Sequence, residues 1–313
     1  MGDMRYRQLG DSGLSVSVVG LGCNNFGRRI DLEATRAVVD AALDQGITLF
    51  DTSDSYGDSE TFLGEVLEGR RDDVVLATKF GSKLADGRLG ADWDARNSRR
   101  YIRKAVESSL TRLRTEWIDL YQLHFPDGKT PMEETLAALH ELVQEGKVRY
   151  VGSSNLDSWQ IADADWVART HGFSRFISAQ NHYSLLEREV ERSVVPACRR
   201  FHVGLLPYFP LANGLLTGKY HRGQAAPEGS RLASLPDRLK QESFDAIEAL
   251  EKYAAERGRT LLDVAIGGLA AKPAVASVIA GATKPEQVRA NVAAGTWKPT
   301  RQEMWDLEVV LSS

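Results

Sequence analysis

The sequence has only two cysteines, Cys23 and Cys198, in 313 residues. Two thiols are too few for a disulfide framework, and their scarcity is typical of proteins in a reducing compartment. No run of about 18 consecutive apolar residues is present, so no transmembrane helix is expected. The first residues also lack the apolar segment of a signal peptide. We therefore expect a cytoplasmic protein that does not associate with membranes.

An excess of positive charge is also missing. The chain has 39 Lys and Arg residues against 43 Asp and Glu residues, which gives a net charge of −4. Proteins that bind nucleic acids neutralise phosphates with clustered Lys and Arg, so nucleic acid is not an expected partner. The six histidines lack the close spacing of zinc ligands, such as His-x-x-x-His, which argues against a metal site.

A Gly-x-Gly-x-x-Gly phosphate loop is absent as well. Residues 20–25 begin like one, with Gly20 and Gly22, but the third glycine is missing. This disfavours a Rossmann domain, in which that loop follows the first strand.

The chain does contain a regular alternation of short apolar runs and amphipathic segments. Residues 4–20 predict a β-hairpin, and eight β-prone runs separated by helical patterns follow. The expected strands are 18–22, 47–50, 74–78, 118–123, 148–152, 176–179, 203–207 and 276–280. Eight alternations favour an α/β protein with a closed barrel over a doubly wound sheet. No stretch resembles a linker, so we predict one domain over residues 1–313.

Helix start and stop signals fill the gaps between these strands. Asp31 is expected to cap a helix that stops at Gly46. Thr130, Pro131 and Glu133 predict a capping box at another helix start. Further helices are expected near 60–67, 102–113, 157–171, 188–201, 239–257, 260–271 and from 283, with a long loop over 212–238.

Four ionisable side chains lie at or just beyond the ends of three strands. Asp51 directly follows the second strand, Tyr56 lies on the loop after it, Lys79 follows the third and His124 the fourth. The carboxyl ends of barrel strands meet on one face, where active sites are built. Taken singly, each residue has an ordinary alternative role: a cap for the Asp, packing for the Tyr, a solvated Lys and a core His.

Together these side chains form a device that can protonate a carbonyl oxygen. Tyrosine has a pKa of about 10, too high for an efficient proton donor at neutral pH. A neighbouring Lys79 ammonium is expected to lower the pKa of Tyr56, and a buried lysine needs the carboxylate of Asp51 to keep its charge. His124 can hydrogen-bond the carbonyl oxygen or relay a proton. Hydride must come from elsewhere, which implies a nicotinamide cofactor.

These motifs resemble those of the aldo-keto reductases. Residues 5–17 are similar to the family's N-terminal hairpin, and residues 46–57, 77–79 and 119–124 are similar to its successive strand-end motifs. The resemblance covers essentially the whole chain. It implies a (β/α)8 TIM barrel whose N-terminal β-hairpin closes the bottom, and an NAD(P)H-dependent oxidoreductase acting on a small-molecule carbonyl substrate.

The roles that the resemblance implies agree with the pKa argument. The position of Tyr56 is the family's acid and that of Lys79 tunes it. The position of Asp51 holds the lysine, and that of His124 orients the carbonyl. An alternative is a nicotinamide-nucleotide sensor or regulatory subunit on the same barrel, because some members of the family are channel subunits.

The resemblance also implies a nicotinamide site. Ser154, Asn155 and Gln180 would hydrogen-bond the carboxamide, and Tyr208 would stack on the ring. Without the resemblance, Ser154 and Asn155 would be assigned to the cap of the helix that starts near Asp157. Matches at these positions disfavour a cofactor-free lyase or isomerase.

Residues 207–220 resemble the loop that covers the pyrophosphate. Leu211 is a candidate cofactor contact and Lys219 a candidate counter-charge, although a purely structural loop is the alternative for Lys219. Phe209 stands where a small hydroxyl residue is usual.

Residues 279–291 resemble the clamp for the adenosine phosphate. The candidate contacts are Gly281, Thr283, Lys284, Gln287 and Asn291. Thr283 and Glu286 predict a capping box, which would point a helix N-terminus at a bound phosphate. Many relatives carry Lys in place of Gly281 and Arg in place of Gln287, and both of these charges are missing here. The resemblance therefore still favours NADP(H), but NAD(H) is possible, because phosphate binding depends largely on charge-assisted hydrogen bonds. The alternative is that these residues only decorate a surface helix.

The substrate pocket is expected to take its walls from loops above the strand ends. The candidates are Asn25, Trp93 and Phe125, of which Trp93 can either close over a ligand or anchor its own loop. The tail after Asn291 shows only a short helical pattern, so a long C-terminal substrate loop is not expected. We expect a monomer or a weak homo-oligomer.

Overall fold

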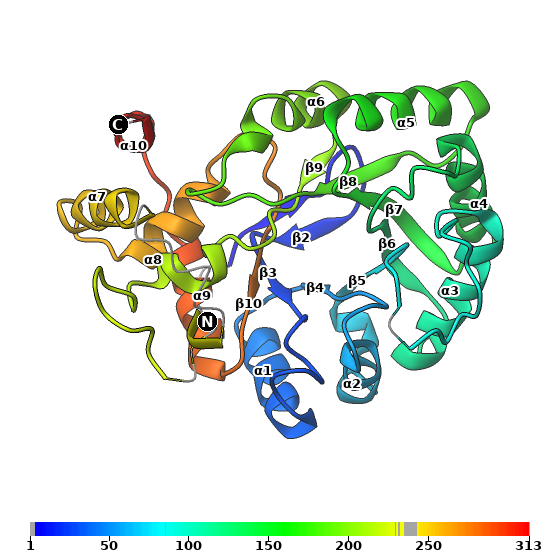
Figure 1. The fold of residues 1–313 in the computed structure, drawn as a ribbon, viewed down its shortest axis with the longest axis horizontal. Coiled ribbons are helices and arrows are strands. Elements are labelled where there is room, and N and C mark those ends of the chain that lie inside the picture. Colours follow the sequence, from blue (N-terminus) through cyan, green and yellow to red (C-terminus); the bar gives the residue numbers. More distant parts are fainter. Residues whose placement is uncertain (1–3, 85, 229, 231, 235–242, 313) are drawn as a thin grey trace.

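The computed structural model describes residues 4–312 except 85, 229, 231 and 235–242. Its centre is an eight-stranded parallel sheet, in the order β10-β3-β4-β5-β6-β7-β8-β9, curled into a barrel with helices outside (Figure 1). Backbone hydrogen bonds close the barrel: Leu205 N donates to Ala274 O at 2.8 Å, and Ala276 N donates to Leu205 O at 2.9 Å. The predicted (β/α)8 barrel is confirmed.

The strands lie close to their predicted positions. They are β3 (Val19–Gly22), β4 (Leu49–Asp51), β5 (Val75–Phe80), β6 (Ile118–Leu123), β7 (Val148–Ser154), β8 (Phe176–Gln180), β9 (Gly204–Leu205) and β10 (Val278–Gly281). Buried apolar side chains fill nearly every strand, as expected for a parallel sheet covered on both faces. Strand β9 is shorter than the predicted 203–207, because there the chain leaves the ladder soon after pairing with β8.

The predicted hairpin is present, formed by β1 (Tyr6–Gln8) and β2 (Ser15–Ser17). Leu9 and Val16 are fully buried and pack in one cluster with barrel-interior residues such as Leu120. Gly10, in the left-handed region at φ 60°, packs against the backbones of Ile177, His202 and Gly204, where a side chain would not fit. The hairpin therefore closes the amino end of the barrel.

The helices surround the barrel (Figure 1). They are α1 (Leu32–Asp44), α2 (Ser59–Val66), α3 (Arg99–Leu113), α4 (Met132–Gln144), α5 (Ser158–His171), α6 (Val194–Phe201), α7 (Ser243–Ala255), α8 (Leu261–Asp263), α9 (Pro285–Gly295) and α10 (Arg301–Ser312). Asp31 caps α1 as predicted, because its carboxylate accepts from Ala34 N at 2.9 Å. Among the described residues, no helix is long and apolar enough to cross a membrane.

The predicted capping box at Thr130 is wrong. Helix α4 begins one residue later than expected, with Pro131 as its N-cap and no side-chain cap. The Thr130 hydroxyl instead donates to Asp127 Oδ2 at 2.7 Å, so a nearer carboxylate outcompetes the helix end for it.

Other differences concern irregular segments. The predicted helix over 188–201 is split into a 3₁₀ turn (Glu189–Glu191) and α6, and the predicted long loop contains a 3₁₀ segment (Ala212–Thr217). The segment after α8 continues as a π-helical turn (Val264–Gly268). Helix α10 is more than the short pattern expected after Asn291. The predicted helix start near 239 lies outside the described residues.

Candidate active site

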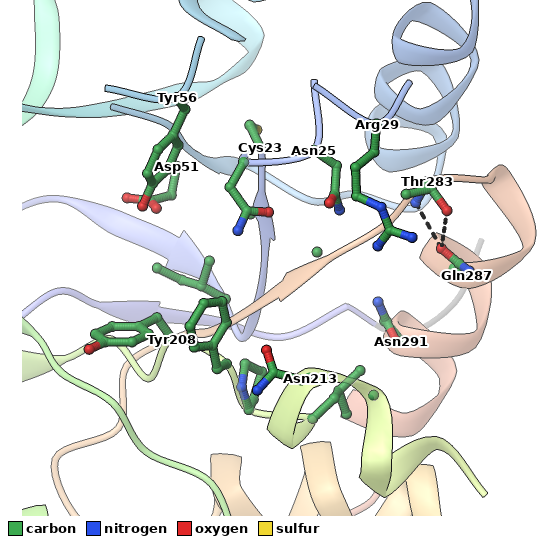
Figure 2. A pocket seen from close by; sticks show the side chains of 18 of the residues that line it. Cys23, Asn25, Arg29, Asp51, Tyr56, Tyr208, Asn213, Thr283, Gln287 and Asn291 are labelled. Carbon is green, nitrogen blue, oxygen red and sulfur yellow. Dashed lines mark hydrogen bonds between the residues drawn. The ribbon is translucent and has the colours of Figure 1, made fainter. Parts of the chain in front are cut away.

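A pocket of about 630 Å³ lies at the carboxyl ends of the strands. Asp51, Tyr56 and His124 line one end, and Gln287 and Asn291 on α9 line the other. Figure 2 shows Asp51 and Tyr56 on the opposite side of the pocket from Gln287 and Asn291. His124 lies with the first group, because its ring centre is 5.8 Å from that of Tyr56. The pocket is therefore elongated enough to connect a proton-transfer group with the region of the predicted phosphate clamp.

Asp51 and Lys79 form a buried ion pair at the base of this pocket. Lys79 Nζ donates to Asp51 Oδ2 at 2.7 Å and to Thr52 O at 2.8 Å, and Lys79 is fully buried. The other oxygen, Oδ1, accepts from Gln122 Nε2 at 3.1 Å and from Gln180 Nε2 at 2.9 Å. Both carboxylate oxygens and two of the three ammonium hydrogens thus have partners, which is the kind of satisfaction that burial of an ion pair requires.

The ammonium of Lys79 lies 5.0 Å from the centre of the Tyr56 ring. Burial alone would lower the pKa of Lys79, but Asp51 and Tyr56 more than offset this, and the net pKa is raised. Lys79 thus stays charged beside the tyrosine. Asp51 is also near enough for its negative charge to raise the pKa of Tyr56.

Lys79 acts on the pKa of Tyr56 in the predicted direction, but the net pKa is raised instead of lowered. Burial raises the pKa of the phenol above 10.0, and the charge of Lys79 only partly opposes this. The tyrosine therefore keeps its proton over the whole neutral range.

His124 presents one edge to two hydroxyls, of the buried Ser53 and the half-buried Ser82. Its Nδ1 lies 3.1 Å from Ser53 Oγ and 2.8 Å from Ser82 Oγ, and its ring stacks on Phe125 at 4.6 Å between centroids. Burial, with the charge of Lys79, lowers the pKa of the imidazole to about 2, so the ring is neutral. A neutral ring with Nδ1 facing inward leaves Nε2 as the nitrogen available to the pocket.

The predicted nicotinamide contacts converge in one network. Asn155 Nδ2 donates to His124 O at 3.0 Å and to Ser154 Oγ at 2.9 Å, and Tyr208 OH donates to Asn155 Oδ1 at 2.8 Å. Ser154 Oγ in turn donates to the backbone oxygen of Gln180 at 2.8 Å. All four residues line the pocket.

The alternative role of Ser154 and Asn155 as helix caps does not hold. The capping box of α5 is made by Asp157 and Gln160, whose side chain accepts from Asp157 N at 2.9 Å. Asn155 adopts the left-handed region at φ 57°, a conformation that asparagine tolerates better than most residues. Its side chain is thereby turned to the pocket instead of the helix.

The region around α9 differs from its predicted capping. Lys284 is the N-cap of α9 and has no side-chain cap bond, so the Thr283–Glu286 capping box is wrong. Instead Thr283 N donates to Gln287 Oε1 at 2.8 Å (Figure 2). Thr283, Gln287 and Asn291 line the pocket, whereas Lys284 is not among the lining residues.

The remaining cofactor candidates come from two parts of the chain, the segment after β9 and the end of β10. Leu211, Lys219 and Gly281 line the pocket, and Lys219 Nζ lies 5.2 Å from the centre of the Tyr220 ring. A Cβ added to Gly281 would lie 3.3 Å from Asn25 Nδ2, so this wall is tightly packed.

Two of the three candidate residues for the substrate pocket lie at the pocket, and one does not. Asn25 and Phe125 line the pocket. Trp93 does not: it is 69% exposed, and the Arg100 guanidinium lies 4.8 Å from its ring centre. This contact and the hydrogen bond from Lys129 Nζ to Trp93 O at 3.0 Å anchor its own loop, as in the alternative considered for it.

Comparison with known proteins identifies the family. The family model described as Aldo/keto reductase family matches residues 18–310. The chain belongs to the aldo/keto reductase family. It is accordingly a nicotinamide-dependent oxidoreductase, and the family typically uses NADP(H).

Curated relatives of this aldo/keto reductase cover almost its whole length. It is 37% identical over 301 residues to "Uncharacterized oxidoreductase YrpG" of Bacillus subtilis (strain 168), covering 93% of this chain and 91% of the relative. It is 34% identical over 309 residues to "L-glyceraldehyde 3-phosphate reductase" of Escherichia coli (strain K12), covering 94% and 88%. It is 35% identical over 304 residues to "Probable voltage-gated potassium channel subunit beta" of Oryza sativa subsp. japonica, covering 93% and 91%.

Several residues at the candidate site of this aldo/keto reductase are not among those predicted from its sequence. Gln122 could have been found, because a polar residue two positions before His124 in an apolar strand faces the same side of the sheet. Ser53 lies two residues after Asp51, so its place near the site was also foreseeable. Arg29 and Asn213 carry no such signal, because they lie on loops whose approach to the pocket depends on the whole fold.

Proposed function

We propose that this protein reduces an aldehyde or a ketone to an alcohol, using NADP(H) in preference to NAD(H). The observation that carries the proposal is the convergence of Tyr56, the Asp51–Lys79 pair and His124 at one end of a single elongated pocket. The family and the reductase names among its relatives support the same reaction class.

Each of these side chains has a distinct task. Tyr56 donates its proton to the carbonyl oxygen as negative charge develops there. Lys79 stabilises the resulting tyrosinate, and Asp51 keeps Lys79 charged. His124, being neutral, donates a hydrogen bond from Nε2 that orients the carbonyl. The nicotinamide, when bound, supplies the hydride.

The pocket fits such a cofactor. Asn155 lines the pocket, and its Oδ1 accepts one hydrogen bond, from Tyr208, which leaves a second lone pair for an amide hydrogen of the nicotinamide. Farther along, Asn213 lines the pocket with a buried Oδ1 that has no hydrogen-bond partner among the described residues. A buried acceptor without a partner is costly, so a donor group of a ligand would relieve it. We assign Gln180 to supporting Asp51, because its amide is engaged there.

The preference for NADP(H) needs a positive charge at the α9 end. Gly281 and Gln287 provide none, but Arg28 and Arg29 on the loop before α1 line the pocket. Figure 2 shows Arg29 reaching toward Thr283 and Gln287. We propose Arg29 as the partner of the adenosine 2′-phosphate, since a guanidinium matches a phosphate with paired hydrogen bonds.

Arg29→Gln is therefore expected to weaken NADPH binding roughly tenfold or more, the size of a charge-assisted hydrogen bond. NADH binding should change less than about twofold, because NADH lacks that phosphate. Fluorescence titration at low and high salt measures both, and the salt dependence of NADPH binding should decrease.

Arg36→Gln is the matched control, because Arg36 is an exposed arginine on α1 that pairs with Glu65. It should leave both affinities unchanged. An equal loss of NADPH and NADH affinity in Arg29→Gln would instead assign the residue to the pyrophosphate and contradict the 2′-phosphate role.

A direct test of the function itself is titration with NADPH followed by a panel of aldehydes and ketones. We expect quenching of intrinsic fluorescence on binding and oxidation of NADPH when a reactive aldehyde is added. Binding without turnover of any carbonyl would favour a nucleotide-sensing role, for which the relative named as a potassium channel subunit beta is the supporting observation. Failure to bind either dinucleotide would contradict both.

We further propose that residues 1–313 act as one domain, as a monomer or weak homo-oligomer, in the cytoplasm. Both cysteines are buried and unpaired, which suits a reducing compartment.

A further inference from the structure

Two acidic side chains that have no part in the proposed proton transfer lie buried beside the proposed active site. Asp54 and Glu60 are each only 1% exposed. Glu60 is fully partnered: Arg112 Nε donates to its Oε2 at 2.8 Å, and Thr78 Oγ1 donates to its Oε1 at 2.6 Å. Asp54 has a single side-chain hydrogen bond, from Ser53 Oγ at 3.2 Å, and its Oδ2 has no partner among the described residues.

Ser53 connects Asp54 to His124. Its buried hydroxyl lies 3.2 Å from Asp54 Oδ1, 3.1 Å from His124 Nδ1 and 3.0 Å from Ser55 Oγ. The amide of Ser55 also donates to Ser53 Oγ at 3.2 Å, which occupies one lone pair. A hydroxyl has one proton and two lone pairs, so Ser53 can donate to only one of these neighbours at a time.

We propose that Asp54, acting through the hydroxyl of Ser53, determines which nitrogen of the neutral His124 ring carries the proton. Asp54 is then a positioning residue, since it touches neither substrate nor cofactor. Its catalytic consequence rests on the proposed carbonyl reduction, whereas the position of the imidazole proton does not.

The two protonation states of Asp54 give two complete hydrogen-bond chains. When the carboxyl is protonated, it donates to Ser53 Oγ, Ser53 donates to His124 Nδ1, and the ring proton is on Nε2, facing the pocket. When the carboxyl has lost its proton to solvent, the carboxylate accepts a hydrogen bond from the Ser53 hydroxyl, which keeps its proton. His124 Nδ1–H then donates to Ser53, and Nε2 becomes an acceptor. Only the first arrangement lets His124 donate to a carbonyl oxygen.

The charges around Asp54 favour its neutral form. The pKa of Asp54 is raised to about 8 by burial and by the negative charge of Glu60 on α2. The hydrogen bond from Ser53, Arg112 on α3 and Arg88 on the loop after β5 only partly oppose this. Tyr101 and Tyr121 also lie near enough to sense the Asp54 charge, but burial raises both of their pKa values. His124 itself faces Lys79, which disfavours an imidazolium.

Ser82 limits the size of the effect. Its hydroxyl lies 2.8 Å from His124 Nδ1 and can donate to that nitrogen whatever the state of Asp54. The coupling to Asp54 should therefore be partial in the natural protein and stronger in Ser82→Ala.

The test measures carbonyl reduction under single-turnover conditions from pH 6 to 9.5, beside ¹⁵N NMR of histidine-labelled protein. We expect the natural protein to lose rate, by up to about tenfold, as the pH rises through about 8. The His124 ¹⁵N signals should report transfer of the ring proton from Nε2 to Nδ1 over the same range. A flat pH profile together with unchanged signals would overturn the proposal.

Asp54→Asn keeps the shape of the side chain and makes it a permanent donor to Ser53. It should remove the inflection near pH 8 from both readouts and retain the high-rate state, and Ser53→Ala should also uncouple the two groups. Asp58→Asn, an exposed acid on the same loop with no capping bond, should behave as the natural protein does. Persistence of the inflection in Asp54→Asn and Ser53→Ala would contradict the proposal. If no carbonyl is reduced, the proposed function fails, and the NMR readout still decides the position of the proton.

Discussion

Replacing Tyr56 with Phe is expected to slow carbonyl reduction by a factor of about 10²–10⁴, the usual contribution of a positioned proton donor. The substitution removes one oxygen and keeps the aromatic ring against Lys79, which lies 5.0 Å from the ring centre. The raised pKa of Tyr56 keeps the phenol protonated at neutral pH. The natural protein therefore carries the proton that it donates throughout the neutral pH range.

Cofactor affinity serves as the internal control for this variant. Tyr56 lies at the opposite end of the pocket from Gln287 and Asn291, so NADPH should bind Tyr56→Phe within about threefold of the natural protein on the scale of a lost neutral hydrogen bond. Single-turnover rates and fluorescence titration measure the two quantities separately. A variant that reduces aldehydes as fast as the natural protein would remove Tyr56 from the role of acid.

Replacing Lys79 with Met is expected to destabilise the fold by about 3–5 kcal/mol and to abolish reduction as well. The lysine is fully buried, and its removal leaves the carboxylate of Asp51, 3% exposed, with only two amide donors. An uncompensated buried charge is far more costly than the loss of a surface ion pair. Urea unfolding followed by circular dichroism gives the free energy of unfolding.

Two further variants make this measurement specific. The double variant Lys79→Met, Asp51→Asn removes both charges and should regain a large part of the lost stability, although not the activity. Arg36→Met breaks an exposed pair with a 3.9 Å separation and should cost at most about 1 kcal/mol. Equal effects of Lys79→Met and Arg36→Met would contradict the importance of the buried pair.

The pH dependence of this contribution follows from the raised pKa of Lys79. A lysine whose pKa is higher in the folded state stabilises the protein fully below its unfolded value of about 10.4 and loses that contribution as pH rises through the folded value. The difference in stability between the natural protein and Lys79→Met should therefore be constant across neutral pH and shrink only in strong alkali.

Much of the barrel and the ends of its strands could be predicted, because buried parallel strands and amphipathic helices leave clear periodic patterns. That is why Asp51, Lys79 and His124 could be placed on one face. Features that depend on which of several nearby groups wins a hydrogen bond could not be predicted. Spacing alone predicts Thr130 as a helix cap, but its hydroxyl donates to Asp127 instead, a contact that no periodicity reveals.

Magnitudes were harder to predict than placement. The direction of the effect of Lys79 on Tyr56 follows from charge alone, whereas the net pKa depends on how deeply the phenol is buried, which only the packed fold determines. Arg29 illustrates a third limit, since a loop residue approaches α9 only once the barrel has closed.

The arrangement around Asp51 has a consequence for folding. This residue ends β4 and accepts side-chain hydrogen bonds from β5 through Lys79, from β6 through Gln122 and from β8 through Gln180. Four strands spread over more than half of the circumference must therefore be in register before one carboxylate is satisfied. Enzymatic activity should accordingly be among the last properties to return on refolding. Fragments that lack β8 should contain secondary structure but no Lys79 held in its buried ion pair with Asp51.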